Sequence, residues 1–201
     1  PDRIWRGTAF GFTNWMPVNI AAVYRPIAGD FDGDGRTDIF WDAPGTATDR
    51  FWYGTSTGFR TAARASQYHG RAAAVVVDAN HDGRDDVLWY SAGSAPELLW
   101  TGHGRSRNST FSAASFPSVS GTYTTVAGDF NADGRSDLLW YAPGPAADAV
   151  WIGAGTAFAT HVPLTVNGRY QPVAGDFDGD GRSDVLWYAP GSTPESIWFG
   201  R

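Results

Sequence analysis

The stretch Asp176-Phe177-Asp178-Gly179-Asp180-Gly181-Arg182-Ser183-Asp184 decides the fold, because three more copies of it stand earlier in the chain. The other copies are Asp30-Phe31-Asp32-Gly33-Asp34-Gly35-Arg36-Thr37-Asp38, Asp78-Ala79-Asn80-His81-Asp82-Gly83-Arg84-Asp85-Asp86 and Asp129-Phe130-Asn131-Ala132-Asp133-Gly134-Arg135-Ser136-Asp137. Their first Asp residues lie 48, 51 and 47 residues apart in a sequence of 201 residues. Self-similarity at a nearly constant period of this length is typical of repeat proteins, in which each unit is one supersecondary element. We number the nine residues of each stretch as loop positions 1 to 9.

Short apolar segments flank every loop. The run after each loop ends in Trp, and a turn and a second apolar run with its own Trp follow. The two Trp residues are always 11 apart, at 41/52, 89/100, 140/151 and 187/198. Apolar segments also precede the loops, at 24–28, 73–77, 123–127 and 170–174, and a Thr/Ser/Ala/Phe-rich stretch closes each unit. Each unit therefore predicts four short strands, with the loop between the first two.

About 48 residues for a four-stranded sheet is the size of a propeller blade. The sequence therefore predicts an all-β fold: a β-propeller of four-stranded blades, with four repeats of about 48 residues visible and residues 1–201 forming a single domain. Both faces of the strands carry apolar residues, as expected for sheets that are covered on both sides. A stacked β-solenoid is the structural alternative, but its repeats are usually shorter.

The numbers of loops and of third-strand segments in the chain do not correspond to a whole number of blades. Residues 2–12 repeat the third-strand segment at residues 49–59, so the chain holds five third-strand segments and four loops. A ring is usually joined by one terminus completing the blade of the other, so residues 2–20 are expected to complete the last blade. One third-strand segment is then surplus, which fits either a piece of a longer array or copies that assemble into a larger ring.

The loop pattern Asp-x-[Asp/Asn]-x-Asp-Gly-x-x-Asp suits calcium. Ca²⁺ takes six to eight oxygen ligands in relaxed geometry. Positions 1, 3 and 5 can offer side-chain oxygens to one point, position 7 a backbone carbonyl and position 9 a carboxylate. Gly at position 6 permits the positive φ that turns the backbone round the ion. Four matches in one chain make an ordinary Asp-Gly hairpin turn a poor alternative, and Mg²⁺ seldom takes an all-protein cage.

The loop is not an EF-hand. Position 12 of an EF-hand loop is normally Glu. Here it is Trp in every copy: Trp41, Trp89, Trp140 and Trp187. The residues after position 9 also have the pattern of a strand and not of a helix, which argues against dockerin-type loops as well.

Loop, period and the following Leu-Trp-Tyr run together resemble the FG-GAP/VCBS repeat family, the integrin α-type β-propellers, over essentially the whole chain. The resemblance implies calcium ions held in the loop between the first two strands of each blade. It carries the metal ligands onto Asp30, Asp32, Asp34 and Asp38; Asp78, Asn80, Asp82 and Asp86; Asp129, Asn131, Asp133 and Asp137; and Asp176, Asp178, Asp180 and Asp184, with the carbonyls of Arg36, Arg84, Arg135 and Arg182. Up to four Ca²⁺ are expected, one per loop. Integrin-type rings usually have seven blades, whereas four loops are present here.

The charge and composition of the sequence exclude several other kinds of function. The formal net charge is −6, but 14 of the 21 acidic residues occupy candidate ligand positions. Four bound Ca²⁺ would bring the net charge to about +2. No basic patch indicates nucleic-acid binding. No apolar run is long enough to span a membrane. Cysteine is absent, so there are no disulfides or thiolate metal sites.

The sequence gives no sign of catalysis. The four histidines (His69, His81, His103 and His161) share no spacing, and the only glutamates, Glu97 and Glu195, take matching places before the third strand. No nucleophile–base or phosphate-loop motif is present. We therefore expect a binding protein and not an enzyme.

The dense aromatic residues suggest two kinds of binding module. Some fungal lectins resemble this propeller family, which favours carbohydrate or extracellular ligand recognition, with Trp15, Tyr53 and His103 as residues that break the repeat and could make surface contacts. For most of the Trp residues, packing between blades is the simpler role. The alternative is a non-catalytic structural or adhesion appendage of a larger secreted bacterial protein. We expect a secreted, extracellular location, with the periplasm as the alternative, because such loops suit millimolar calcium.

Overall fold

The computed structural model describes residues 2–43, 47–63, 72–93, 96–103, 111–115, 119–144, 146–155, 157–191 and 194–201, without the side chains of residues 14, 15, 62, 63, 114 and 115. Over these ranges the chain forms 17 strands and no helix. Every pairing between neighbouring strands is antiparallel.

The strands form five sheets. Three have four strands: β3 (Arg25–Gly29), β4 (Asp38–Asp42), β5 (Arg50–Thr55) and β6 (Gly58–Ala63); β7 (Ala73–Val77), β8 (Asp86–Tyr90), β9 (Leu98–Gly102) and β10 (Phe111–Ser115); β11 (Thr124–Gly128), β12 (Asp137–Tyr141), β13 (Asp148–Gly153) and β14 (Phe158–Leu164). The last sheet has three strands: β15 (Gln171–Gly175), β16 (Asp184–Tyr188) and β17 (Ser196–Trp198). The first has two: β1 (Asp2–Thr8) and β2 (Gly11–Val18).

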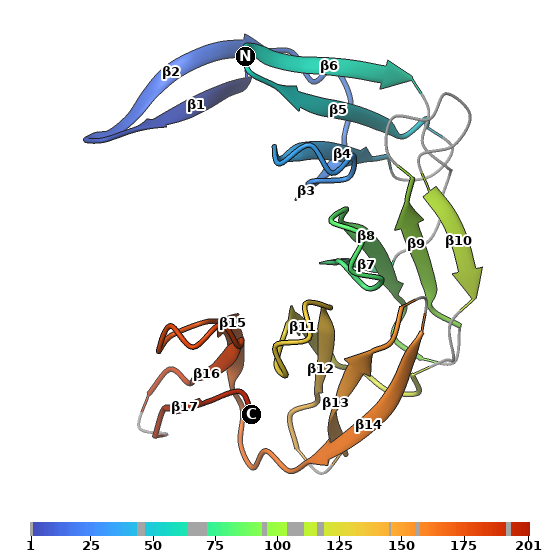
Figure 1. The fold of residues 1–201 in the computed structure, drawn as a ribbon, viewed down its shortest axis with the longest axis vertical. Coiled ribbons are helices and arrows are strands. Elements are labelled where there is room, and N and C mark those ends of the chain that lie inside the picture. Colours follow the sequence, from blue (N-terminus) through green and yellow to red (C-terminus); the bar gives the residue numbers. More distant parts are fainter. Residues whose placement is uncertain are drawn as a thin grey trace.

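The sheets follow one another round an open arc, as Figure 1 shows. The first strands, β3, β7, β11 and β15, lie nearest the centre, and β6, β10 and β14 lie at the outside. First strands of successive sheets contact each other. This is a β-propeller of four-stranded blades, as the repeat predicted.

The number of sheets differs from the prediction. The sequence predicted four units, but five sheets are present, because the segment at 2–18 folds into a hairpin of its own. Residues 2–20 were expected to complete the last blade. Instead β1 pairs only with β2, and β17 takes the third-strand place on β16 within the described chain. The reason is the surplus third-strand segment: β1 and β17 are equivalent, and β17 is the one next to β16 in sequence.

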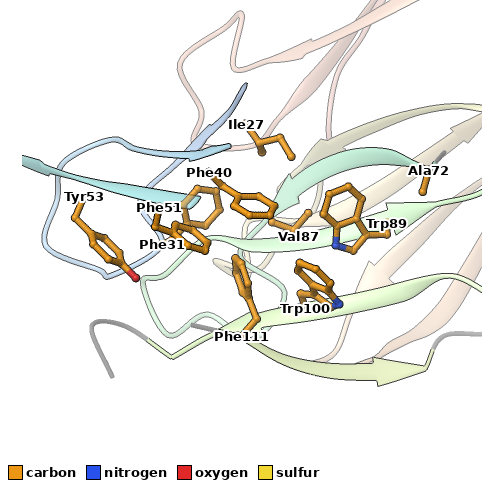
Figure 2. Packing of buried hydrophobic residues seen from close by; sticks show 10 residues of the cluster. All are labelled: Ile27, Phe31, Phe40, Phe51, Tyr53, Ala72, Val87, Trp89, Trp100 and Phe111. Carbon is orange, nitrogen blue, oxygen red and sulfur yellow. The ribbon is translucent and has the colours of Figure 1, made fainter. Parts of the chain in front are cut away.

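Large apolar side chains fill the space between successive sheets. Figure 2 shows the cluster between the β3–β6 and β7–β10 sheets, where Phe40 of β4 meets Trp89 of β8 edge-on with ring centroids 6.2 Å apart. On β8, Val87 and Trp89 pack toward the preceding sheet, whereas Leu88 and Tyr90 pack toward the following one. Strand alternation therefore gives each blade two apolar faces, which is why the sequence shows no polar face.

The Trp at position 12 has the packing role expected of it. Trp89, Trp140 and Trp187 are at most 1% exposed. Trp41, on the first four-stranded sheet, is only partly buried.

Candidate metal centres

The position-1 carboxylate organises each loop through backbone hydrogen bonds. In the first loop, Asp30 Oδ1 accepts the Gly33 N–H at 2.8 Å and Oδ2 accepts the Gly35 N–H at 2.7 Å. In the last loop, Asp176 accepts the N–H groups of Gly179 and Gly181 at 2.7 and 3.0 Å. The chain therefore wraps round this side chain, and the carboxylate sits inside the turn.

The position-9 carboxylate joins the loop to the third strand. Asp38 Oδ2 accepts the Phe31 N–H at 3.0 Å, and its Oδ1 accepts the Gly54 N–H at 2.7 Å. The equivalent side chains, Asp86, Asp137 and Asp184, make the same two bonds to position 2 and to the Gly at the end of the third strand. All four are at most 1% exposed.

Carboxylates converge where the sequence predicted a metal. Oxygens of Asp30, Asp32 and Asp38 lie within 4.8 Å of one another. The same holds for Asp176, Asp178 and Asp184. The second and third loops have Asn80 and Asn131 at position 3. Their Oδ1 atoms accept the N–H of position 5 at 2.9 Å, as Asp32 Oδ1 does at 3.2 Å, so the amide oxygen takes the place of the carboxylate oxygen.

Burial and crowding raise the pKa of three position-9 carboxyls, those of Asp38, Asp86 and Asp137. Burial raises the pKa of Asp86 to about 7 and that of Asp38 to about 6, even though two N–H donors lower each of them. The position-1 carboxylates Asp78 and Asp30 add repulsion in the same direction. Burial likewise raises the pKa of Asp137. Carboxylates that resist ionisation beside other carboxylates are the groups a hard cation would stabilise.

The side chain at position 7 has a role that the sequence analysis missed. The sequence predicted only its carbonyl as a ligand, but the guanidinium folds back onto the position-5 carboxylate in every loop. The Nη1–Oδ2 distances are 3.1, 3.1, 3.7 and 2.9 Å for Arg36–Asp34, Arg84–Asp82, Arg135–Asp133 and Arg182–Asp180. These pairs are partly exposed and each contributes little stability by itself. These pairs hold the position-5 side chain in one orientation. The Arg that occupies position 7 in all four loops was the feature of the sequence that could have predicted them.

Two loop positions require a positive φ. Gly at position 6 has φ between 76° and 87°, as predicted. Position 4 also has positive φ in all four loops: 73° at Gly33, 56° at His81, 59° at Ala132 and 80° at Gly179. Because position 4 is Gly, His or Ala in different loops, the sequence did not indicate this positive φ.

The structure also locates the other residues singled out from the sequence. Tyr53 is 2% exposed and stacks on Phe51, so it is not a surface residue. His103 is exposed and interacts with Ser112 Oγ. His161 stacks on Trp151. The side chain of Trp15 and all of His69 lie outside the described residues.

Glu97 is a structural residue in this fold. It is fully buried, burial raises its pKa, and its Oε2 accepts the Val119 N–H at 3.0 Å. Asp148, its counterpart in the next repeat, accepts the N–H groups of Ala142 and Val166 at 2.9 and 2.8 Å. The carboxylate before the third strand thus fastens the turn and the segment leading to the next blade.

Four consecutive sheets, each with an acidic loop between its first two strands, define a repeat propeller with candidate cation sites. An FG-GAP-like repeat matches residues 30–89, and the FG-GAP repeat matches residues 121–153 and 168–198. These segments together span more than half of the sequence. The chain belongs to the FG-GAP repeat family, the family of the integrin α-type propellers, as its loops indicated.

Solved structures confirm the fold. One is a lectin from Agrocybe aegerita, described as recognising non-reducing terminal N-acetylglucosamine, with a TM-score of 0.58, 15% identity and coverage of 83% of this chain and 47% of that one. Another is a mutant Tc holotoxin pore of Photorhabdus luminescens, with a TM-score of 0.57, 13% identity and coverage of 93% of this chain and 12% of that one. The chain thus spans less than half of either protein. No curated protein matches the sequence.

Position 4 gives a direct test of the loop geometry. Replacing Ala132 by Gly should raise the free energy of unfolding by about 1 kcal/mol, because a left-handed Ala is strained and Gly is not. For a chain of this size that is roughly 2–4 °C in melting temperature. The matched reverse change, Gly179→Ala, adds a Cβ into open space at φ 80° and should lower the melting temperature by a similar amount. Equal melting temperatures for both variants and the parent would contradict the loop conformation.

The buried position-9 carboxyls predict how the metal-free protein responds to pH. The pKa of these carboxyls is higher in the folded protein than the unfolded value of 3.8, so their contribution to stability is fully present below pH 3.8. That contribution is lost as the pH rises through about 6 for Asp38 and about 7 for Asp86. The metal-stripped chain should therefore melt at a higher temperature at pH 5 than at pH 8. The double variant Asp38→Asn/Asp86→Asn should show a smaller difference, with Asp85, Glu97 and Asp137, whose pKa values burial also raises, left to supply the remainder. A metal-free parent that is more stable at pH 8 would refute the assignment.

Proposed function

We propose that this chain is a calcium-stabilised β-propeller module that binds carbohydrate outside the cell and catalyses no reaction. The observation that carries the proposal is the convergence of Asp30, Asp32 and Asp38, and of Asp176, Asp178 and Asp184, in two loops of one repeated pattern. The two parts of the proposal, the metal and the sugar, rest on different residues.

Calcium fits the loops by chemistry and by charge. Positions 1, 3, 5 and 9 supply oxygen atoms only, which is the donor set that Ca²⁺ prefers. Burial raises the pKa of Asp86 to about 7, so a positive charge nearby would favour its ionised form at neutral pH. Calcium would supply that charge. Loops one and four have four carboxylates at these positions and loops two and three have three, so the latter should bind more weakly.

Trp52 is the best candidate for a sugar platform. On the β11–β14 sheet, His161 lies opposite Trp151 and stacks on it, with ring centroids 4.1 Å apart. On the β3–β6 sheet the residue opposite Trp52 is Thr61, so no ring stacks on the indole from that position, and Phe59 contacts Trp52 only at a tilt, with ring centroids 5.9 Å apart. A pocket of about 440 Å³ lies here, lined by Asn19, Ile20, Ala21, Ala22, Tyr24, Trp41, Arg50, Trp52 and Thr61.

This pocket has the composition that sugars need. An aromatic face can pack against the apolar side of a pyranose, and Asn19, Arg50 and Thr61 can form hydrogen bonds with hydroxyl groups. The similarity of the fold to the Agrocybe aegerita lectin supports carbohydrate as the ligand class and makes terminal N-acetylglucosamine a suitable first probe.

The remaining parts of the proposal follow from the family and from the roles of the acids. FG-GAP repeats are typical of extracellular proteins, which fits a secreted module. The described chain contains no helix able to span a membrane. The loop acids and Glu97 serve the fold or the metal, so we assign no carboxylate to acid–base catalysis. The alternative, an adhesion or spacer appendage, would share the metal sites and lack the sugar site.

A glycan array with added calcium tests the function. We expect saturable binding to one class of glycan, with terminal N-acetylglucosamine among the probes. Trp52→Ala should weaken it about 30-fold, the usual effect of removing an aromatic anchor. Trp5→Ala is the control, because Trp5 is 60% exposed and lies outside the pocket lining. No binding to any glycan on a diverse array would exclude the sugar site and favour the appendage. Equal losses of glycan affinity in the two variants would exclude Trp52 as the platform.

A further inference from the structure

Adjacent acidic loops contact each other at three joints, one between each pair of successive sheets from β3–β6 to β15–β17. The residue at position 8 of one loop donates its N–H to the position-1 carbonyl of the preceding loop, at 2.8 Å for Asp85–Asp30, 2.9 Å for Ser136–Asp78 and 2.6 Å for Ser183–Asp129. Its side-chain oxygen accepts the N–H of the same position-1 residue at 2.6, 2.9 and 3.0 Å. At each joint, both backbone polar groups of a position-1 residue are therefore held by the next loop.

The donor at each joint belongs to a peptide group that also carries a predicted metal ligand. The N–H of position 8 and the carbonyl of position 7 are parts of one peptide group, which is planar and rigid. The position-7 carbonyl, of Arg84, Arg135 or Arg182, is a predicted ligand in its own loop. An ion bound to that carbonyl therefore also fixes the direction of the N–H that reaches the preceding loop.

The acceptor at each joint is connected to a second predicted ligand. The position-1 carbonyl shares its peptide group with the N–H of position 2. That N–H donates to the position-9 carboxylate of its own loop, at 3.0 Å for Phe31–Asp38, 3.1 Å for Ala79–Asp86 and 2.9 Å for Phe130–Asp137. Two peptide groups and two hydrogen bonds thus connect a ligand of one loop to a ligand of the next.

The residue held across the joint is also the one round which its loop is wound. The Asp129 carboxylate accepts the N–H of Asp133 at 3.1 Å and that of Gly134 at 2.8 Å, much as the Asp30 carboxylate binds the first loop from within. Ordering one loop therefore helps to place the central carboxylate of the preceding loop.

We propose that calcium binding is positively coupled between adjacent loops, so that an ion in one loop raises the affinity of its neighbours. This inference rests on the calcium sites of the proposed function. Both hydrogen bonds at a joint need both loops in their binding conformation, so the loop that fills first bears part of the ordering cost of the second. Polarisation acts in the same direction, because calcium on the position-7 carbonyl makes the N–H of that peptide group a stronger donor.

The coupling matters most for the two loops that have three carboxylates. Asn80 and Asn131 stand at position 3 of loops two and three, and each of these loops is joined to a loop with four carboxylates. Loops one and four then strengthen binding in loops two and three. Calcium fills the row over a narrower range of concentration than four independent sites with these charges would show.

Asp85 offsets repulsion between neighbouring ions at the first joint. Position 8 is Ser at the other two joints, whereas here a carboxylate oxygen accepts the Asp30 N–H. Burial raises the pKa of Asp85, and repulsion from Asp30 and from Asp78 adds to that effect, so this carboxylate lies close to the first ligand of both loops. A negative charge shared by two sites reduces the net repulsion between two bound Ca²⁺.

Calcium titration followed by native mass spectrometry tests the coupling, with the product of the stepwise binding constants as the readout. Asn131→Ala and Asp178→Ala remove the position-3 ligand from loops three and four, and neither side chain takes part in a joint. We expect the double variant to lose about fivefold less than the two single losses multiplied together, because both single losses include the shared joint. The matched control combines Asp32→Ala with Asp178→Ala. Loops one and four share none of the three joints, so their losses should multiply.

Ser183→Ala tests the assigned contact. It removes the hydroxyl that accepts the Asp129 N–H and keeps every predicted ligand, so the fivefold excess should fall below twofold. Ser183→Thr keeps the hydroxyl and should keep the excess. Ser136→Ala makes the same test between loops two and three, with Asn80→Ala and Asn131→Ala as the ligand variants, and serves if Ser183→Ala does not fold.

The outcomes distinguish this inference from the proposed function. Calcium binding in which the losses of loops three and four multiply, or in which the double loss is larger than their product, would overturn the coupling and leave the calcium sites in place. An excess that survives in the position-8 Ala variants would overturn the role of the joint. A parent chain that binds no calcium would overturn both proposals.

Discussion

A buried carboxylate at loop position 9 ties three parts of every repeat together. It accepts one N–H from the loop and one from the Gly that ends the third strand, so the first, second and third strands are fixed relative to one another at a single charged group. Burying a charge costs several kcal/mol unless it is compensated. The raised pKa values of Asp38 and Asp86 show that two N–H donors compensate only in part. The calcium that we propose would supply the remainder, which couples metal binding to the fold.

The repeat made most of the fold predictable, because its spacing, its turns and its two Trp residues are local features repeated four times. It correctly predicted four-stranded sheets, the positive φ of Gly35 and its equivalents, and the burial of Trp140. Features that depend on tertiary position were missed. Residues 2–18 formed a fifth sheet, Tyr53 proved buried, and position 4 took a positive φ with Ala132 as well as with Gly33. Of the predicted metal ligands, Asp30, Asp32 and Asp38 converge, as do Asp176, Asp178 and Asp184. The inward turn of Arg36 onto Asp34 depends on a side-chain rotamer that no pattern encodes.

Small exchanges between repeats distinguish otherwise similar blades. Asp42 with Arg25 replaces a Tyr at one joint, and Thr61 replaces a stacking His beside Trp52. The first exchange distinguishes the contact between the β3–β6 and β7–β10 sheets from the contacts that Tyr90 and Tyr141 make between the later sheets. The second opens the pocket that we propose for a sugar.

Native mass spectrometry combined with thermal melting, with and without a chelator, tests the central claim most directly. The loops predict up to four Ca²⁺ per chain, with two held more tightly than the other two, and a clear fall in melting temperature when the metal is removed. A chain that carries no calcium, or that melts at the same temperature after chelation, would contradict the account.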